Sequence, residues 1–443
     1  MNNASIWQKT VSFPAFAPLD GDASAKVAII GGGITGLLTA HLLRDQHPMI
    51  LEAGRICSGQ TGRTTAKITS QHDLIYADLI RREGEDAAAQ YAHANQEAIA
   101  EYARIIDEGR IDCGFTPCDA YLYSTAESAP LEQEAEAARR IGLQASFTRE
   151  TELPFPIAGA LQFRDQARFH PLAFLQAIAD GLDVRENTRV LSVEDDRIHT
   201  DRGTVRAEHI VFACHYPFVN VPGWYFARMH QERSYVIALD SAWLPKHVHL
   251  GIDGDGLSFR EAEGLLLLGG GSHRTGENPD GGKYDFLRDR ARTLFPRAKE
   301  VAHWSAQDCV TVDRIPCIGH YARSQPGWYV ATGFAKWGMT SAMVAARIIA
   351  GMVRGTPPEW AEVFSPQRPV ISGDNMKPLM NEAGHVLRHL AKVTPAPRCS
   401  HLGCELTWNP DEESWDCPCH GSRFGADGAL IDGPAQTDIC TKA

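Results

Sequence analysis

The strongest hydrophobic pattern lies near the N-terminus, where an apolar run leads into a set of glycines. Residues 27–30 are apolar without a break, which is typical of a strand that is buried on both faces. Three glycines follow at G-x-G-x-x-G spacing, namely Gly31, Gly33 and Gly36. Leucines then recur at helical spacing, and a second apolar run at 49–51 ends in Glu52. The pattern predicts a strand, a tight turn, a helix and a second strand.

Further along the chain, stretches with helical periodicity alternate with stretches typical of strands. Helices are predicted at 83–109, 131–141, 170–182, 284–295, 381–392 and from the end of the 332–340 turn through Arg354. Strands are predicted at 114–124, 232–239, 264–268, 328–331 and, as several short pieces, over 184–213. Residues 1–25 read as a tail that packs over the domain through Trp7 and Phe13, and prolines at 357, 358, 366 and 369 mark a linker.

The composition is that of a globular protein. Of the 443 residues, 44% are hydrophobic, and at roughly 150 residues per domain the length fits two or three domains. The net charge is −12 without any basic run, which argues against nucleic acid and against an anionic membrane surface as partners. No apolar run approaches the roughly 20 residues of a membrane span, and the first residues lack a signal-peptide pattern. We therefore expect a cytoplasmic protein.

The glycine spacing predicts a dinucleotide site. Gly31 permits the turn, Gly33 lets the backbone approach a pyrophosphate, and Gly36 lets the helix pack on the strand. Glu52 stands about twenty residues on, where a carboxylate would hold ribose hydroxyls. The alternative is a structural βα turn that binds no nucleotide. The best second fingerprint, 265–276, has an arginine at the third glycine position and no predicted helix after it. We expect one dinucleotide and no NAD(P)H domain.

Further segments stand in the order of a known family. Arg63, Thr64 and Thr65 follow the nucleotide unit, Val190 lies in a predicted strand, and residues 313–319 read D-x-x-P-x-I-G. A turn with Gly333, Gly338, Met339 and Thr340 comes last. Over roughly residues 26–355 this order resembles the D-amino acid oxidase/glycine oxidase group of FAD-dependent oxidoreductases.

The resemblance implies that the dinucleotide is FAD. The residues it assigns to FAD are Gly31, Gly33, Gly36, Glu52, Arg63, Thr64, Thr65, Val190, Gly333, Gly338, Met339 and Thr340. The last turn also has a physical rationale, because a glycine turn that opens a helix directs free N–H groups and the positive dipole end at one spot. There they would stabilise the negative charge of the reduced flavin. The alternative is a simple strand-to-helix turn.

The substrate position departs from the family pattern. The amino-acid oxidases of this group keep an arginine five residues before the aspartate of D-x-x-P, where it binds the substrate carboxylate. Here that position is Asp308, which favours an amine donor over a simple α-amino acid. The alternative is that Asp308 points away and pairs with Arg314 or Arg274. The candidate catalytic residues are Asp308, Lys336, Tyr235 and His273, and each could equally serve ordinary packing.

Four of the eleven cysteines crowd one stretch near the C-terminus. Cys399, His401 and Cys404 form a C-x-H-x-G-C box, and Cys417, Cys419 and His420 lie in a C-P-C-H-G-S box. Such crowding indicates a metal site before a disulfide scaffold. Two cysteines and two histidines could hold zinc.

The paired boxes resemble those of Rieske [2Fe–2S] proteins. The resemblance implies that Cys399 and Cys417 hold one iron, and that His401 and His420 hold the other. It also implies a disulfide between Cys404 and Cys419, a cluster hydrogen bond from Ser422, Phe424 where tyrosine is frequent, and a covering loop at 433–435. A Rieske domain usually has several strands before its first box. Only residues 394–398 separate a helical segment from this box, so the base looks shortened.

Together the resemblances imply a fold of α/β and α+β class. A Rossmann-like FAD-binding domain is interleaved with an antiparallel-sheet substrate domain and followed by a small, mainly-β Rieske domain. We expect a tail at 1–25, the oxidoreductase at 26–355, a linker and helix at 356–393, and the Rieske domain at 394–443. Within the oxidoreductase, the FAD-binding parts fall at 26–70, 150–215 and 326–355, and the substrate parts at 84–147 and 216–325.

The expected function is a dehydrogenase. A small amine or amino-acid-like donor passes a hydride to FAD, and the [2Fe–2S] cluster relays single electrons to an external acceptor, either a protein or a quinone-like carrier. The alternative is an electron-transfer protein that supplies a partner oxygenase.

Overall fold

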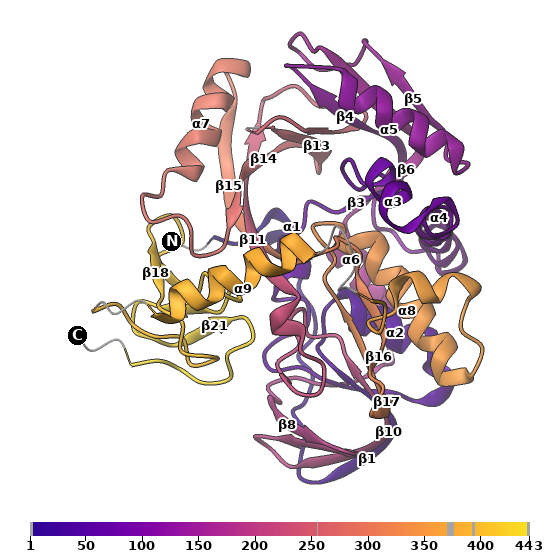
Figure 1. The fold of residues 1–443 in the computed structure, drawn as a ribbon, viewed down its shortest axis with the longest axis vertical. Coiled ribbons are helices and arrows are strands. Elements are labelled where there is room, and N and C mark those ends of the chain that lie inside the picture. Colours follow the sequence, from indigo (N-terminus) through magenta and orange to yellow (C-terminus); the bar gives the residue numbers. More distant parts are fainter. Residues whose placement is uncertain (1–2, 255, 370–375, 392–394, 441–443) are drawn as a thin grey trace.

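The structure is a computed structural model that describes residues 3–254, 256–369, 376–391 and 395–440. Its strands form sheets of eight, nine and four strands, and the chain ends in a small domain that is yellow in Figure 1. We refer to residues 395–440 as the C-terminal domain. The predicted boundary at residue 394 lies outside the described residues. Among the helices that the structure describes, none is long and apolar enough to cross a membrane.

The eight-stranded sheet carries the N-terminal glycine turn. Its order is β16-β17-β10-β1-β2-β7, and β9 pairs with both β10 and β8. The strands are β1 (Ala23–Ile30), β2 (Met49–Leu51), β7 (Asp183–Arg185), β8 (Val190–Glu194), β9 (Arg197–Thr200), β10 (Thr204–Phe212), β16 (Cys317–Ala322) and β17 (Gln325–Thr332). β1 is parallel to β2 and β10, and Val27, Ala28 and Ile29 are fully buried. The continuous apolar run is explained because both faces of β1 are covered.

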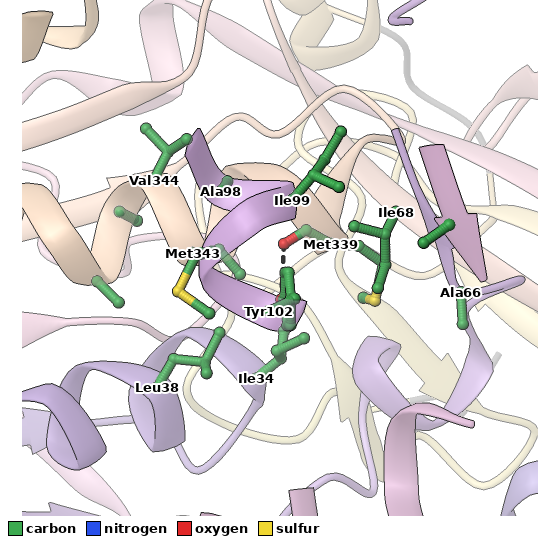
Figure 2. Close-up of a cluster of buried hydrophobic side chains, with 14 of the residues drawn as sticks. Ile34, Leu38, Ala66, Ile68, Ala98, Ile99, Tyr102, Met339, Met343 and Val344 are labelled. Atoms are coloured by element: carbon green, nitrogen blue, oxygen red, sulfur yellow. Dashed lines mark hydrogen bonds between the residues drawn. The ribbon is translucent and has the colours of Figure 1, made fainter. Parts of the chain in front are cut away.

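Three helices pack together beside this sheet. They are α2 (Ile34–Leu42), α4 (Glu85–Gly109) and α8 (Gly338–Arg354). Figure 2 shows Leu38 of α2 and Met343 of α8 close to α4 in one apolar cluster. The Tyr102 hydroxyl of α4 donates to the Met339 carbonyl oxygen at 2.8 Å. This bond fixes the first turn of α8, which the sequence predicts to face the flavin.

The nine-stranded sheet forms the other half of the oxidoreductase. Its order is β15-β11-β14-β13-β12-β4-β6-β3, with β5 paired to β6. The strands are β3 (Lys67–Ile68), β4 (Thr116–Ser124), β5 (Ala145–Thr148), β6 (Gly159–Arg168), β11 (Met229–Asp240), β12 (Val248–Gly251), β13 (Ser258–Ala262), β14 (Leu265–Arg274) and β15 (Lys299–Thr311). The helices α5 (Ala129–Arg140) and α7 (Lys283–Leu294) pack on this sheet, α3 (Tyr76–Glu83) packs on α4 and α5, and α6 (Pro171–Ala179) packs on α2 beside the first sheet.

The expected division of residues 26–355 is wrong at three strands. β3 and β6 were expected in FAD-binding parts, but they belong to the second sheet. β16 was expected in a substrate part, but it pairs with β17 of the first sheet. The reason is that strand pairing is set by long-range packing, and the local pattern of a strand does not say which sheet it joins.

The N-terminal segment is built into the core. It contains α1 (Ile6–Thr10), in which Trp7 is only 1% exposed. The Trp7 indole N–H donates to the Thr64 carbonyl oxygen at 2.7 Å, and the ring lies under the Arg260 guanidinium. Phe13 is half-buried against the same core. The segment therefore supports the loop at 63–65 that the sequence assigns to FAD.

The C-terminal domain is joined to the oxidoreductase by α9 (Met376–Ala391), which runs across the middle of the molecule in Figure 1. Its sheet has four short strands, β18 (Thr407–Asn409), β19 (Ser414–Asp416), β20 (Arg423–Gly425) and β21 (Leu430–Asp432). The domain rests on the second sheet through buried charges, since Arg233 of β11 lies 3.6 Å from Asp416 and 3.9 Å from Glu412. On α9, Glu382 pairs with Arg274 of β14 at 2.8 Å. The two large sheets thus support the two cysteine–histidine boxes, at the side where the sequence predicts a shortened base.

Candidate functional site

A cavity of about 630 Å³ is lined by residues from both large sheets. Most of the residues assigned to FAD line it, namely Gly31, Gly33, Glu52, Arg63, Thr64, Thr65, Val190, Gly333, Gly338 and Met339. Three candidate catalytic residues, Asp308, Lys336 and Tyr235, line it as well. Gly36, Thr340 and His273 are not among its lining residues.

The glycine turn is built so that side chains are excluded from it. Gly31 has a φ of +110°, and a Cβ there would lie 2.5 Å from the Ala213 carbonyl oxygen. A Cβ on Gly36 would overlap the Gly31 carbonyl oxygen, so Gly36 lets α2 pack directly against the turn. This packing explains why Gly36 supports the cavity without lining it.

Glu52 holds the same turn from the end of β2. Its carboxylate accepts from the backbone N–H groups of Gly32 and Gly54, each at 2.8 Å. Burial raises the pKa of Glu52, while these two hydrogen bonds oppose the rise. A carboxylate at the wall of the cavity, beside the phosphate-binding turn, fits the ribose of a dinucleotide.

The start of α8 lines the cavity and carries the last of the predicted FAD contacts along the chain. Its first residue is Gly338, and the cap residue Trp337 makes no side-chain cap hydrogen bond. The Thr340 hydroxyl donates to the Thr69 carbonyl oxygen at 3.0 Å and lies 3.0 Å from His72 Nε2. Its side chain therefore anchors the helix, and its hydroxyl is not available for the predicted contact with FAD.

Asp308 faces the cavity, and the predicted alternative pairing is wrong. Arg274 pairs with Glu382 at 2.8 Å, and Arg314 pairs with Asp73 at 3.1 Å. Burial raises the pKa of Asp308, and the nearby Lys336 ammonium opposes this rise. A half-buried carboxylate at the wall of a cavity is suited to bind a cation.

The other three candidates have internal partners. Lys336 forms an ion pair with Glu232 at 2.7 Å. The Tyr235 hydroxyl accepts from Asn409 Nδ2 at 3.2 Å, so its polar end faces the C-terminal domain. The structure does not bring His273 to the cavity, because its ring stacks on Tyr235 and its Nδ1 lies 3.2 Å from the Gly271 carbonyl oxygen.

The cavity also contains residues that the sequence analysis missed. Lys67 of β3 lines it and donates to the Ser258 hydroxyl, and no carboxylate of the described residues lies within 4 Å of its ammonium. Arg423, Asp432 and Gln436 of the C-terminal domain line the cavity too. Lys67 could have been suspected from its position two residues after Thr65. The C-terminal residues carry no such signal, because their place depends on how the domains pack.

Replacing Lys67 by Met is expected to stabilise the protein most at and below pH 7. Burial lowers the pKa of Lys67 to about 7, whereas an unfolded chain keeps its proton up to about pH 10. Unfolding therefore takes up a proton between these values, and the stability of the parent rises with pH over that range. At about 1.4 kcal/mol per pKa unit, the gain in the free energy of unfolding has an upper bound of about 4 kcal/mol. The difference in Tm between variant and parent should shrink from pH 7 to pH 10. For a Lys246→Met control at an exposed site, the difference in Tm from the parent should not change with pH. A pH-independent difference for Lys67→Met would contradict this account.

The two cysteine–histidine boxes meet in the C-terminal domain. Cys399 and Cys417 are 3% and 1% exposed, and the His401 and His420 rings are 5.0 Å apart. His401 Nε2 lies 2.9 Å from Asn220 Oδ1, and His420 Nε2 lies 3.1 Å from the Phe226 carbonyl oxygen. The Nδ1 atoms of both histidines are buried without a hydrogen-bond partner.

This arrangement fits a cluster held by two thiolates and two imidazoles. Two unpaired Nδ1 atoms together with two buried thiols form a donor set suited to a metal cluster, and the Nε2 partners of the histidines fix the tautomer that leaves Nδ1 free to ligate. Cys404 and Cys419 form a disulfide. Gly433 has a φ of +104° and lies directly over Ser422, where a Cβ would clash with the Ser422 backbone. The loop after β21 therefore covers the boxes.

Comparisons with known proteins agree with this geometry. Residues 26–352 match the family described as FAD dependent oxidoreductase, and residues 389–442 match the Rieske [2Fe-2S] domain. The Rieske 2Fe-2S iron-sulfur protein YhfW of Bacillus subtilis (strain 168) is 34% identical over 97% of this chain and 96% of its own length. Gamma-glutamylputrescine oxidoreductase of Escherichia coli (strain K12) is 24% identical over 77% of this chain and 87% of its own.

The solved structures support the same fold. Glycine oxidase from Geobacillus kaustophilus superposes with a TM-score of 0.67 at 21% identity, covering 78% of this chain and 99% of the oxidase. The predicted fold class and both predicted cofactors, FAD and a [2Fe–2S] cluster, are thereby confirmed. The chain belongs to the family of FAD-dependent oxidoreductases and carries a Rieske [2Fe–2S] domain at its C-terminal end.

Proposed function

We propose that the protein is a dehydrogenase of small amines that passes electrons through its Rieske domain to an external one-electron acceptor. The observation that carries this proposal is the position of Asp308, a carboxylate that pairs with neither Arg274 nor Arg314, at the wall of the cavity lined by most of the residues predicted to bind FAD. FAD supplies hydride acceptance there, and the cluster supplies one-electron transfer.

The residues of the chain have separate tasks in this proposal. Asp308 binds and orients a positively charged group of the donor. The start of α8 stabilises negative charge that develops on the ring, because its N–H groups and dipole end face the cavity. Cys399, Cys417, His401 and His420 hold the cluster, and Asn220 and Phe226 of the oxidoreductase orient the two imidazoles.

Relatives with named activities guide the choice of donor. Gamma-glutamylputrescine oxidoreductase is named for an amine derivative, and glycine oxidase for an amino acid. The carboxylate at position 308 favours the first of these classes over the second, since it would repel a substrate carboxylate.

The test is an anaerobic screen of small amines followed at the flavin absorbance. A donor should bleach the flavin without any added protein, and the EPR signal of the reduced cluster should follow. The Cys417→Ser variant should still bleach but should lose turnover with one-electron acceptors. If that variant used oxygen as fast as the parent uses any acceptor, the relay would be wrong. Bleaching only after addition of a protein reductant would instead support an electron-transfer protein that supplies an oxygenase.

A further inference from the structure

Two strands lie between one wall of the cavity and the loop that carries His420. β15 presents Ala306 and Asp308 to the cavity, while Gln307, which lies between them, contacts the C-terminal domain. On β11, which pairs with β15, Gln231 contacts the same domain. At this wall the cavity and the cluster loop lie on opposite sides of β11 and β15, whereas Arg423, Asp432 and Gln436 of the C-terminal domain reach the cavity elsewhere.

Two buried glutamines bind the cluster loop directly. Gln231 Nε2 donates to the His420 carbonyl oxygen at 2.8 Å, and Gln307 Nε2 donates to the Gly421 carbonyl oxygen at 2.7 Å. Gln307 Nε2 also donates to Gln231 Oε1. The two side chains are 1% and 0% exposed. Gly421 packs so closely on Gln231 that a Cβ would lie 2.7 Å from the Gln231 Cβ.

The other ends of these contacts reach residues of the cavity wall. His215 lines the cavity, and its Nε2 lies 3.3 Å from Gln231 Oε1. Gln60 also lines the cavity, and its Oε1 accepts from the Gln307 backbone N–H at 2.7 Å. Two continuous hydrogen-bonded connections result, His215–Gln231–His420 and Gln60–Gln307–Gly421. Both end on the backbone of the second cluster-binding box.

We propose that Gln231 and Gln307 form the bridge through which electrons pass between the flavin and the cluster. The inference rests on the proposed function. In each passage the reduced flavin is oxidised by one electron and the oxidised cluster is reduced by it, and no atom is transferred. The second electron follows after the external one-electron acceptor has reoxidised the cluster.

The physical basis is electronic coupling, which falls less steeply through covalent and hydrogen bonds than through a gap between side chains. Burying amides at an internal contact is unfavourable unless every polar atom has a partner. Here the two glutamines are hydrogen-bonded to each other, to residues of the cavity wall and to the cluster loop. Apolar side chains could fill the same space, but they would leave the two carbonyl oxygens of the cluster loop without donors. Gln231 and Gln307 act through the loop and are positioning residues.

The bridge can be tested without knowing the donor. The FAD of the full-length protein is photoreduced anaerobically, and cluster reduction is followed by absorbance and EPR. Gln231→Met, which keeps the length of the side chain and removes its hydrogen bonds, should slow cluster reduction several-fold. Adding Gln307→Met should slow it further. The control is Gln166→Met, because Gln166 is equally buried and bonded, to Ser70 N and Arg164 O, in a different part of the sheet.

The outcomes separate the bridge from the relay. A parent protein whose reduced flavin never reduces the cluster would overturn the relay and the bridge together. A parent that transfers electrons no faster than both glutamine variants would overturn the bridge alone. Equal slowing in Gln166→Met, or a shift of the cluster potential that accounts for the slower rate, would also overturn it. Unchanged EPR signals and potentials with slower transfer would support it.

Discussion

Replacing His420 by Ala is expected to abolish the [2Fe–2S] cluster while FAD stays bound. Within the two boxes, His420 and His401 each supply a buried Nδ1 atom that lacks a hydrogen-bond partner. Without an imidazole, the iron on that side keeps a single protein ligand. Purified variant should show no labile sulfide, no iron and no EPR signal after dithionite. Its flavin content per chain should match that of the parent.

FAD should remain because its predicted contacts come from another part of the chain. The glycine turn and Glu52 directly follow strands of the first sheet, and α8 is anchored by Tyr102 of α4 and, through Thr340, by the Thr69 carbonyl oxygen. The C-terminal domain contributes only part of the cavity wall. Its own core around Leu406 and Phe424 and the Cys404–Cys419 disulfide do not depend on His420.

The matched control for this experiment is His249→Ala. His249 is as buried as His420 and its Nδ1 also lacks a hydrogen-bond partner, but it lies on β12, outside the C-terminal domain. Its loss should leave iron and sulfide unchanged. Stoichiometric zinc without labile sulfide in the parent would contradict the cluster. An iron content in His420→Ala equal to that of the parent would show that His420 is not a ligand.

The parts of this fold that could be predicted are those fixed by nearby residues. Gly31 has a positive φ and Gly36 packs against the Gly31 carbonyl oxygen, both within one turn, so their spacing alone reveals the turn. Each cluster box likewise places a cysteine and a histidine in one loop. These features depend on a few bonds along the chain, and tertiary packing does not alter them.

The parts that could not be predicted depend on contacts between distant segments. β6 joins the second sheet because β4 pairs with it, and nothing within its own residues says so. His273 looked equivalent to Tyr235, yet stacking turned it away from the cavity. Gln60 Nε2 donates to Asp432 Oδ2 at 2.5 Å, and this contact follows only from the docking of two domains. Strand pairing and domain docking are long-range effects that no local pattern contains.

Replacing Asp308 by Asn is expected to weaken the binding of cationic donors by about ten-fold. The carboxylate lies at the cavity wall, and the arginines that could have neutralised it pair with Glu382 and Asp73. Asparagine keeps the size and the hydrogen-bonding oxygen but removes the charge. A charge-assisted hydrogen bond contributes about 1.5 kcal/mol over a neutral one, which corresponds to roughly ten-fold in affinity.

The measurement is the dependence of anaerobic flavin reduction on donor concentration. KM or the half-saturating concentration should rise for donors with an ammonium group and stay constant for neutral analogues of similar size. Because burial raises the pKa of Asp308, acid pH should protonate the carboxylate and weaken the binding of cations in the parent. The Asp308→Asn variant should keep its affinity for cations at acid pH, since its amide does not titrate.

A control must separate the effect of the altered net charge of the protein from the loss of the carboxylate at position 308. Asp285→Asn on the exposed face of α7 alters the net charge equally and is 75% exposed, so it should leave donor binding unaltered. Two results together would show that Asp308 does not select cations. One is efficient flavin reduction by glycine, sarcosine or D-amino acids, and the other is an Asp308→Asn variant with the donor affinity of the parent. Tighter binding of carboxylate donors by Asp308→Asn would support the assignment, because removing a negative charge removes the repulsion that excludes them.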